Sequence, residues 1–428
     1  MKWQFRYMVI LISSLLLVAL GFVLWTSTQK KILRIGVYAG SSWDVPNSRE
    51  NRILDNIIRQ FEKSHPQVRV VYESGIPKKD YDGWLAEKIL KGEQPDVFMV
   101  PENDFSMLAA SGAFKSLDSL LSKDEVAAYY PVAYQAGQYQ GHSYALPIES
   151  NPVMMCVNKD LLEKEGVSIP DSNWTLEDLY AICQKVTKDT NGDGLIDQYG
   201  ITDYTWKQAL VAYNGHLRNQ SGVNVDSAKM HQALSFISKL TSLNQRYKVT
   251  SNDFDEGKVA FYPMSLAQYR TYKPYPYHVA KYSRFSWTCI PMPAAKAGIP
   301  ATQVKTSLFA MSSKTKQDKL AWEFMKLLCQ NQKTQQNLFE KSQGTSVLLS
   351  VVKSSQTKKI LQADDFGLNS LTSQRLDHMM KHSVLDISRD VDYHSLERID
   401  HLLENALKNN EIDSRLPSIQ REMEETGK

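Results

Sequence analysis

Cysteine is scarce in this chain, and its few occurrences are far apart. The 428 residues contain four, at positions 156, 183, 289 and 329. No two of them form a C-x-x-C pair, which excludes the usual spacing of zinc sites and thioredoxin-like redox motifs. Cys183 and Cys329 lie in helical patterns, and Cys156 and Cys289 lie in strand-like ones. We interpret all four as buried free thiols, which behave as small hydrophobic residues, with one disulfide as the alternative.

An excess of one charge is also missing. Lys and Arg number 50 and Asp and Glu 47, so the net charge is only +3. This balance excludes the strongly basic surface of a typical nucleic-acid-binding protein, and it gives no reason to expect an acidic polymer as partner. The shares of hydrophobic residues (42%) and charged residues (23%) are typical of a globular chain. The length predicts two or three domain-sized units.

The signature motifs of three enzyme classes are absent. The chain has no G-x-S-x-G, no G-x-x-x-x-G-K-[ST] and no G-x-G-x-x-G, so nucleophile-elbow hydrolases, P-loop NTPases and dinucleotide-binding enzymes have no support. His378 and His382 are four residues apart, but Met379 occupies the place of the glutamate that a zincin needs. Two ligands are too few for a typical metal site. We interpret both as surface or interface histidines.

One long hydrophobic run is present, near the N-terminus. Met8–Trp25 is an uncharged run of 18 residues that follows Lys2 and Arg6. Its length reaches the lower end of the roughly 17–25 residues that span a bilayer. No A-x-A cleavage pattern ends the run. We predict an uncleaved signal-anchor over residues 1–31, with a transmembrane helix at 8–25; cleavage near residues 26–29 is the alternative.

After this run, strand-like and helix-like segments alternate at short spacing. Apolar strands are predicted at 32–38, 68–72 and 96–100, and helices at 53–61 and 81–90. In the first of these helices, apolar residues recur every three or four positions and mark one face. The alternation predicts an α/β domain with a largely parallel sheet.

Residues 144–200 carry the most specific pattern. They contain, in order, Y-A-L-P, N-K-D-L-L, W-T-L-E-D-L and D-T-N-G-D-G-L-I-D-Q-Y-G. Together these pieces resemble the middle of extracellular solute-binding proteins of the maltose and multiple-sugar type, the capture subunits of ABC importers. Further pieces at 254–261, 288–293 and 306–329 extend the resemblance over about residues 32–426.

This resemblance implies a two-lobed α/β fold of the type II periplasmic-binding-protein kind, with a hinge between the lobes. Lobe 1 is expected to comprise 32–147 and 290–345, and lobe 2 to comprise 148–289 and 346–428. Such a protein catalyses no reaction and requires no cofactor; it captures a solute and delivers it to the permease subunits of an ABC transporter. Basic residues flank both ends of the hydrophobic run, so the resemblance decides the orientation. We expect the bulk of the chain on the outer face of the cell membrane.

The ligand implied by the resemblance is a mono- or oligosaccharide. Sugar rings present apolar faces to aromatic side chains, and their hydroxyls need carboxylates or amides as partners. The residues predicted on these grounds to line the cleft are Trp43, Asp44, Glu102, Asp104, Glu149, Asn151, Trp206, Tyr213, Tyr262 and Tyr269. Trp43, Glu149, Trp206 and Tyr269 are favoured, because their segments match cleft-lining segments of the resembled family. For any single aromatic residue, core packing is the alternative.

The loop 189–197 fits the first nine places of an EF-hand-like calcium loop. Asp189, Asn191, Asp193 and Asp197 are the candidate ligands, because calcium prefers oxygen ligands at this spacing around a glycine turn. The twelfth place holds Gly200 instead of the bidentate glutamate. A structural calcium ion is therefore one interpretation, and a bare Asn/Gly/Asp-rich turn is the other.

Two other functions remain as alternatives to solute delivery. The uncleaved N-terminal helix favours a membrane-tethered ligand sensor of the same fold that signals through a partner. A surface glycoside-processing enzyme is the third hypothesis, and it would need two carboxylates about 5–10 Å apart. The sequence contains many carboxylates but gives no means of pairing them.

Overall fold

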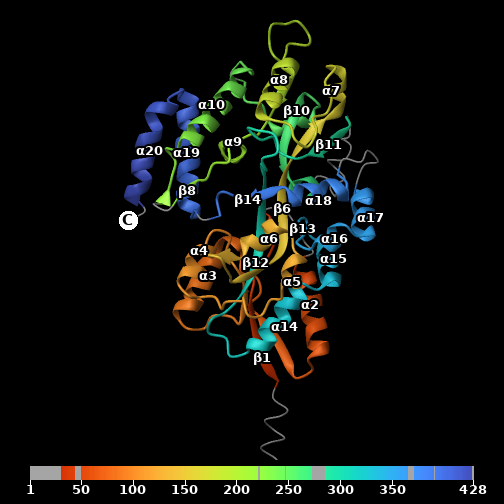
Figure 1. Cartoon of the computed structure of the whole chain (residues 1–428), viewed down its shortest axis with the longest axis vertical. Helices are drawn as coiled ribbons and strands as arrows, with labels where there is room; N and C mark the ends of the chain where they lie inside the picture. Colours follow the sequence, from red (N-terminus) through yellow and green to blue (C-terminus); the bar gives the residue numbers. More distant parts are fainter. Residues whose placement is uncertain are drawn as a thin grey trace, which may run out of the picture.

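The computed structural model describes residues 30–43, 50–219, 222–245, 247–271, 285–364, 371–389 and 391–426. The hydrophobic run predicted to span the membrane, residues 8–25, lies outside these ranges. Within them, no helix is both long and apolar enough to cross a membrane. The chain forms two lobes joined by a narrower middle, with both crossing strands β6 and β12 running lengthwise through it (Figure 1).

Lobe 1 begins with the predicted alternation of strands and helices. In β1 (Lys31–Gly36), Leu33 and Ile35 point into the core while the residues between them are exposed. Helix α2 (Glu50–Ser64) buries the apolar face predicted from the sequence and ends before a proline. The remaining elements of lobe 1 are β2 (Val68–Tyr72), α3 (Lys78–Leu90), β3 (Val97–Met99), α4 (Phe105–Ala110), α5 (Lys123–Ala127) and α14 (Asp318–Cys329).

Strand β6 (Ala145–Asn158) connects the two lobes and is buried along almost its whole length. Its first half pairs antiparallel with β12 (Thr302–Met311), and its second half pairs antiparallel with β10 (Val259–Ser265) and β11 (Trp287–Ile290). Among the described residues, ten strands form this one mixed sheet, in the order β2-β1-β3-β12-β6-β10-β7 along its main path. The sheet is parallel at β1–β2 and β1–β3 and antiparallel around β6.

Lobe 2 packs helices around the β10 and β11 end of β6. Its elements are α7 (Lys159–Lys164), α8 (Leu176–Val186), β7 (Tyr199–Ile201), α9 (Trp206–Ala212), α10 (Ala228–Ser242), α11 (Ser251–Asp255), α12 (Leu266–Thr271), α19 (Tyr393–Asn409) and α20 (Ile412–Thr426). Two short hairpins, β4 (Gln138–Tyr139) with β5 (His142–Ser143) and β8 (Arg218–Asn219) with β9 (Gly222–Val223), lie outside the main sheet.

The helices after residue 331 contribute to two hydrophobic clusters. The apolar faces of α15 (Gln332–Lys341), α16 (Leu349–Val352), α17 (Ser355–Asp364) and α18 (Ser373–Lys381) join the cluster that also contains the core of β1 and α2. Those of α19 and α20 join the cluster of lobe 2. The segment expected to belong to lobe 2, residues 346–428, thus contributes apolar side chains to two clusters. The chain crosses a third time after β14 (Ser383–Leu385), which pairs with β12.

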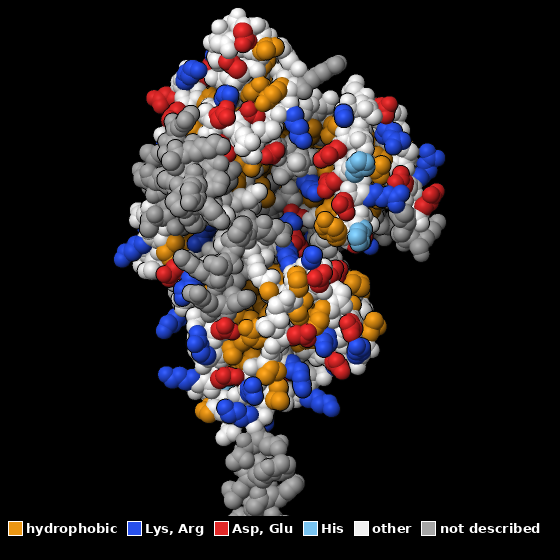
Figure 2. Space-filling view, turned by 180° about the vertical axis from the view of Figure 1, so that it is seen from behind, with side chains coloured by type: hydrophobic (Ala, Val, Ile, Leu, Met, Phe, Trp, Pro, Cys, Tyr) orange, Lys and Arg blue, Asp and Glu red, His pale blue; other side chains and the backbone are white. Residues whose placement is uncertain are grey.

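Charge is distributed evenly over the surface. Viewed from behind, Lys and Arg side chains are interspersed with Asp and Glu over both lobes (Figure 2).

The predicted burial of the cysteines is confirmed, since all four are buried, and each is a free thiol in the structure. Helix α6 (Pro131–Ala136) and strand β13 (Thr345–Ser346), which pairs with β6, complete the middle of the molecule.

The start of α8 tests how far local sequence signals set this fold. Thr175 and Asp178 form a capping box: the Thr175 side chain accepts from the Asp178 backbone N–H at 3.2 Å, and the Asp178 carboxylate accepts from the Thr175 N–H at 2.8 Å. We expect Thr175→Ala to lower the free energy of unfolding by about 1 kcal/mol, because two helix-end N–H groups lose this arrangement. Urea denaturation measures the change. Thr175→Ser is the matched control and should retain most of the stability; equal losses in both variants would contradict the capping role.

Candidate ligand site between the lobes

An ionic network lies where lobe 1 meets the crossing strands. Glu102, on the loop after β3, accepts from the ammonium group of Lys305 on β12 and from that of Lys78 at 3.4 Å. Lys78 also donates to the backbone oxygen of Ser42 at 3.0 Å. Burial raises the pKa of Glu102, but the two ammonium groups outweigh it and hold that pKa below its ordinary value. Three loops of lobe 1 are thereby tied to β12.

Glu149 is a buried carboxyl on the crossing strand β6. Its Oε1 accepts from the Ser342 hydroxyl and from the Gly344 backbone N–H, the latter at 2.8 Å. Burial raises the pKa of Glu149; the Ser342 hydroxyl, the Gly344 N–H, the indole of Trp43 and the charge of Arg270 act in the opposite direction without cancelling that effect. A Cβ added to Gly344 would lie 2.5 Å from Glu149 Oε1, so only glycine fits at this position.

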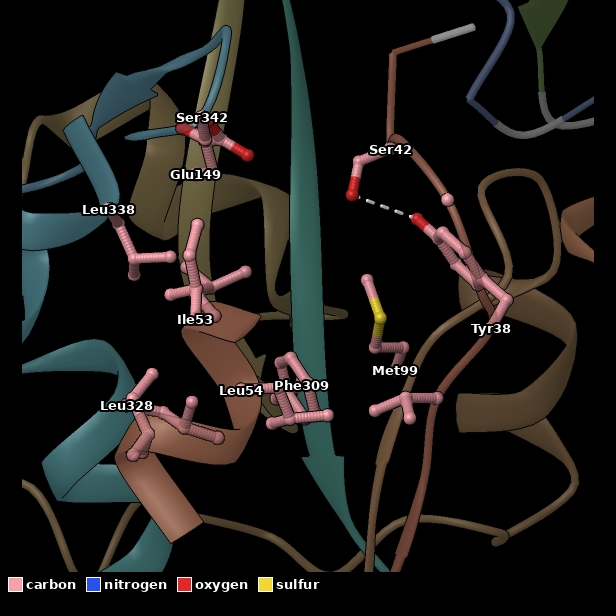
Figure 3. A pocket seen from close by; sticks show the side chains of 14 residues that line it. Tyr38, Ser42, Ile53, Leu54, Met99, Glu149, Phe309, Leu328, Leu338 and Ser342 are labelled. Atoms are coloured by element: carbon pink, nitrogen blue, oxygen red, sulfur yellow. Dashed lines mark hydrogen bonds between the residues drawn. The ribbon is translucent and has the colours of Figure 1, made fainter. Parts of the chain in front are cut away.

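Glu149 opens into a hollow of about 90 Å³, which Tyr38, Ser42 and Ser342 also line. Its polar groups gather at one end, where Tyr38 donates to Ser42 at 3.1 Å and Ser342 meets Glu149 (Figure 3). The other end is apolar and is lined by residues of α2, β12, α14 and α15, among them Ile53, Leu54, Phe309, Leu328 and Leu338. This combination suits a ligand with both hydroxyl groups and apolar faces.

The buried Arg270 of α12 connects lobe 2 to the turn that holds Glu149. Its guanidinium donates to the backbone oxygens of Gly344, at 2.8 Å, and Phe339, at 2.7 Å, and its Cζ lies 4.8 Å from the centre of the Phe339 ring. Asn151 acts from the strand side, because its Oδ1 accepts from the Ala267 N–H at the start of α12 at 2.9 Å. A movement of α12 would therefore be felt at Glu149.

Asp104 lies on the same loop as Glu102, between β3 and α4. Burial, together with the carboxylates of Asp82 and Asp392, raises the pKa of Asp104. Because Asp392 caps the start of α19, this repulsion acts between lobe 1 and a helix of lobe 2. The next residue, Tyr393, is 65% exposed. A smaller hollow of about 30 Å³ also lies here and is lined by Glu102, Lys305 and Arg389.

The structure thus brings Trp43, Glu102, Asp104, Glu149 and Asn151 to the crossing region. The other described residues predicted to line the cleft lie elsewhere.

Trp206 is buried in the core of lobe 2 and donates its indole N–H to Asp400 at 2.7 Å. Tyr262 and Tyr269 are buried in the cluster that contains β1 and α2, with the Tyr269 ring 5.4 Å from that of Trp287. Tyr213 packs against the lobe 2 cluster at the end of α9. Asp44 lies outside the described residues.

Sequence reasoning did not select Lys78, Lys305, Ser342, Gly344 or Arg270. Lysines and serines of this kind are scattered through the sequence without spacing that marks a site. Arg270 is 74 residues from its partner Gly344. The signal nearest to Arg270 is the tyrosine-rich run Y-R-T-Y-K-P-Y-P-Y at 269–277, which is equally typical of a solvated loop.

The loop 189–197 is exposed and is closed by its own hydrogen bonds. Asp189 accepts from the backbone N–H groups of Gly192 and Gly194, each at 2.7 Å, and these bonds lower its pKa. Asp197 accepts from the N–H and the hydroxyl of Thr190, each at 2.8 Å. Nowhere in the described part of the chain do three His, Cys, Asp or Glu side chains come together in a way that could hold a metal ion.

Comparison with known proteins decides what kind of molecule carries this site. The family model for the bacterial extracellular solute-binding protein matches residues 56–364, which is well over half of the chain. The chain belongs to this family. Solute-binding proteins of this kind act by binding, so the assignment as a protein that is not an enzyme follows from the family.

Solved solute-binding proteins share the fold. The sugar-binding protein MalE from Xanthomonas citri is 16% identical, with a TM-score of 0.72 over 92% of this chain and 97% of that one. An ABC substrate-binding protein from Listeria monocytogenes in complex with cycloalternan is 18% identical, with a TM-score of 0.62 over 93% and 99%. Both confirm the two-lobed periplasmic-binding-protein-like α/β fold.

A curated relative matches over a shorter region. The maltotriose-binding protein of Pyrococcus abyssi is 25% identical over 138 residues, which is 32% of this chain and 30% of the relative. The chain therefore spans less than a third of that relative in this match.

The buried carboxyl of Glu149 gives this binding protein a distinctive pH response. Because the folded-state pKa is raised, its contribution to stability is complete below the ordinary pKa and is lost as the pH rises through the folded-state pKa. We expect the wild type to lose stability relative to Glu149→Gln as the pH rises above about 4.5 toward the raised folded-state pKa, as measured by urea denaturation. Glu102→Gln is the control with opposite sign, because the pKa of Glu102 is lowered. Parallel pH profiles of wild type and Glu149→Gln would contradict the assignment.

The acidic loop allows a direct test of calcium binding. Because its carboxylates already accept backbone N–H groups, we expect a metal chelator to leave the melting curve of the purified chain unchanged. A drop in melting temperature that calcium reverses, and that Asp189→Asn abolishes, would instead establish a structural calcium ion at this loop.

Proposed function

We propose that this solute-binding protein captures a carbohydrate between its lobes and delivers it to an ABC permease. The observation that carries the proposal is the hollow beside Glu149, where hydrogen-bonding groups gather at one end and apolar side chains at the other. The relatives support the ligand class: one is named for maltotriose, one is a sugar-binding protein, and one was solved with cycloalternan.

The indole of Trp43 supplies a specific reason for a hydroxyl ligand. Its N–H is buried and has no fully formed hydrogen bond within the described part of the chain, although it lies close enough to lower the pKa of Glu149. A buried donor without an acceptor costs about 1–3 kcal/mol. A sugar hydroxyl between Trp43 and Glu149 would accept from the indole and donate to the carboxylate, which satisfies both groups at once.

Ligand capture would act on the equilibrium between open and closed forms. A solute that contacts both lobes favours the closed form by the difference between its affinities for the two forms. The contacts of Arg270 and Asn151 would carry the position of α12 in lobe 2 to the turn that holds Glu149.

The predicted N-terminal helix would determine where in the cell the protein acts. Residues 8–25 would anchor the protein in the cell membrane, with both lobes on the extracellular face, so that the permease and the membrane are its partners. The relatives reported above are described as binding proteins, which favours transport over the sensor alternative.

The proposal is tested by ligand screening of the purified chain. We expect one class of mono- or oligosaccharide to raise the melting temperature by several degrees, because a ligand at about 100 times its dissociation constant adds about 2.7 kcal/mol. Amino acids and peptides serve as the comparison panel. A shift with these solutes, and none with any sugar, would overturn the carbohydrate assignment.

A pair of matched variants then locates the site. Trp43→Phe keeps an aromatic ring and removes the N–H, so the dissociation constant of the identified sugar should rise by about 5- to 100-fold. Trp206→Phe removes an N–H from the core of lobe 2 and should leave the dissociation constant unchanged. Isothermal titration calorimetry measures both. Equal affinity in the wild type and Trp43→Phe would place the ligand elsewhere.

A further inference from the structure

Two of the four cysteines lie directly opposite each other in the main sheet. Cys156 on β6 and Cys289 on β11 are register partners in an antiparallel pair. Their sulfur atoms are 3.7 Å apart, and both side chains are fully buried. The two residues are 133 positions apart in the sequence, so their meeting is a product of the fold.

This arrangement meets the backbone requirement of a disulfide. Directly opposite residues of an antiparallel pair have Cα atoms about 4.5–5.5 Å apart, which falls within the roughly 4.4–6.8 Å that a disulfide needs. The sulfur atoms must approach to about 2.0 Å, a movement that side-chain rotation can supply. No rearrangement of either strand is required.

The other two cysteines do not share this geometry. Cys183 lies on α8 in the lobe 2 cluster, and Cys329 lies on α14 in the cluster that contains β1. The Cys329 thiol contacts the backbone oxygen of Leu146. Cys183 and Cys329 therefore lie on helices outside the β6–β11 strand pair. The chain has one facing pair of thiols and two single thiols.

We propose that Cys156 and Cys289 form a disulfide bond in the exported protein. The family is extracellular, and disulfides persist in that oxidising environment. The reaction is thiol–disulfide exchange with an external disulfide, such as that of a dithiol oxidoreductase. Two S–H bonds break and one S–S bond forms. The external S–S bond breaks, and its two sulfur atoms take up the two electrons and the two protons to become two thiols.

The bond forms before the strands are fully packed. Burial raises the pKa of the Cys156 thiol, and the neighbouring Cys289 raises it further, so the folded thiol carries little reactive thiolate. An external disulfide also has no access to fully buried sulfur. Oxidation therefore belongs to the stage at which β11 pairs with β6, and the folded protein then protects the bond from reductants.

The bond would link two segments that cross between the lobes, β6 and the segment from β11 into β12, at their lobe 2 ends. Cys156 lies near the end of β6, and Cys289 lies just before the segment that leads into β12. Both strands would then leave lobe 2 from one covalently fixed point. Bending between the lobes would be confined to the part of β6 and β12 on the lobe 1 side of these cysteines.

The thiol count of the full-length exported chain tests the proposal. The protein is denatured in iodoacetamide without reductant, and its intact mass is measured. We expect two alkylated cysteines before reduction and four after it, and a peptide map that links Cys156 to Cys289. Four alkylated cysteines without reduction, or a link through Cys183 or Cys329, would overturn the proposal.

Stability measurements provide a second test that does not depend on a single variant. Reductant present during unfolding should lower the melting temperature of the wild type, of Cys183→Ala and of Cys329→Ala by several degrees. It should have no effect on Cys156→Ala or Cys289→Ala, which lack one partner. If reductant leaves the wild type unchanged and the wild type also has four free thiols, the pair is reduced. This result would leave the proposed carbohydrate binding untouched.

Discussion

The continuous backbone pairing of β6 is the constraint on which the rest of the structure depends. This strand is buried over almost its whole length, so its backbone polar groups need partners on both edges. It takes them from β12 and β13 in the middle of the molecule and from β10 and β11 in lobe 2. Glu149, Asn151 and Cys156 all lie on this strand, so its register fixes their positions.

Much of the fold could be predicted from the sequence where the signal is local. The apolar face of α2, the alternation of β1 and the capping box at Thr175 each depend on residues within one turn or one strand. The placement of α16–α18 was not predictable in this way. Their apolar faces suit either lobe, and only packing against α15 and β13 assigns them to the middle of the molecule.

The candidate site likewise contains some residues that a local sequence motif predicts and others that only the fold brings together. Glu102 and Glu149 follow strand motifs whose place in the sheet is recognisable, and they lie where the crossing strands meet lobe 1. Trp206 and Tyr269 have the residue type expected of a sugar site, but they are core residues, because aromatic composition does not distinguish a ring that packs from a ring that binds. The Arg270–Gly344 contact joins segments too distant for any sequence pattern to relate.

The ladder between β6 and β12 contains a shift in register, with Ser307 opposite Glu149 and Leu308 opposite Pro147. The extra residue on β6 is Ile148, beside the buried carboxyl. Such an irregularity lets a paired ribbon twist and curve more than a regular one does. A ribbon of this kind deforms elastically: small strains spread over many bonds, and the restoring force grows with the angle. The curvature of this ribbon therefore contributes to the resting angle between the lobes before any solute arrives.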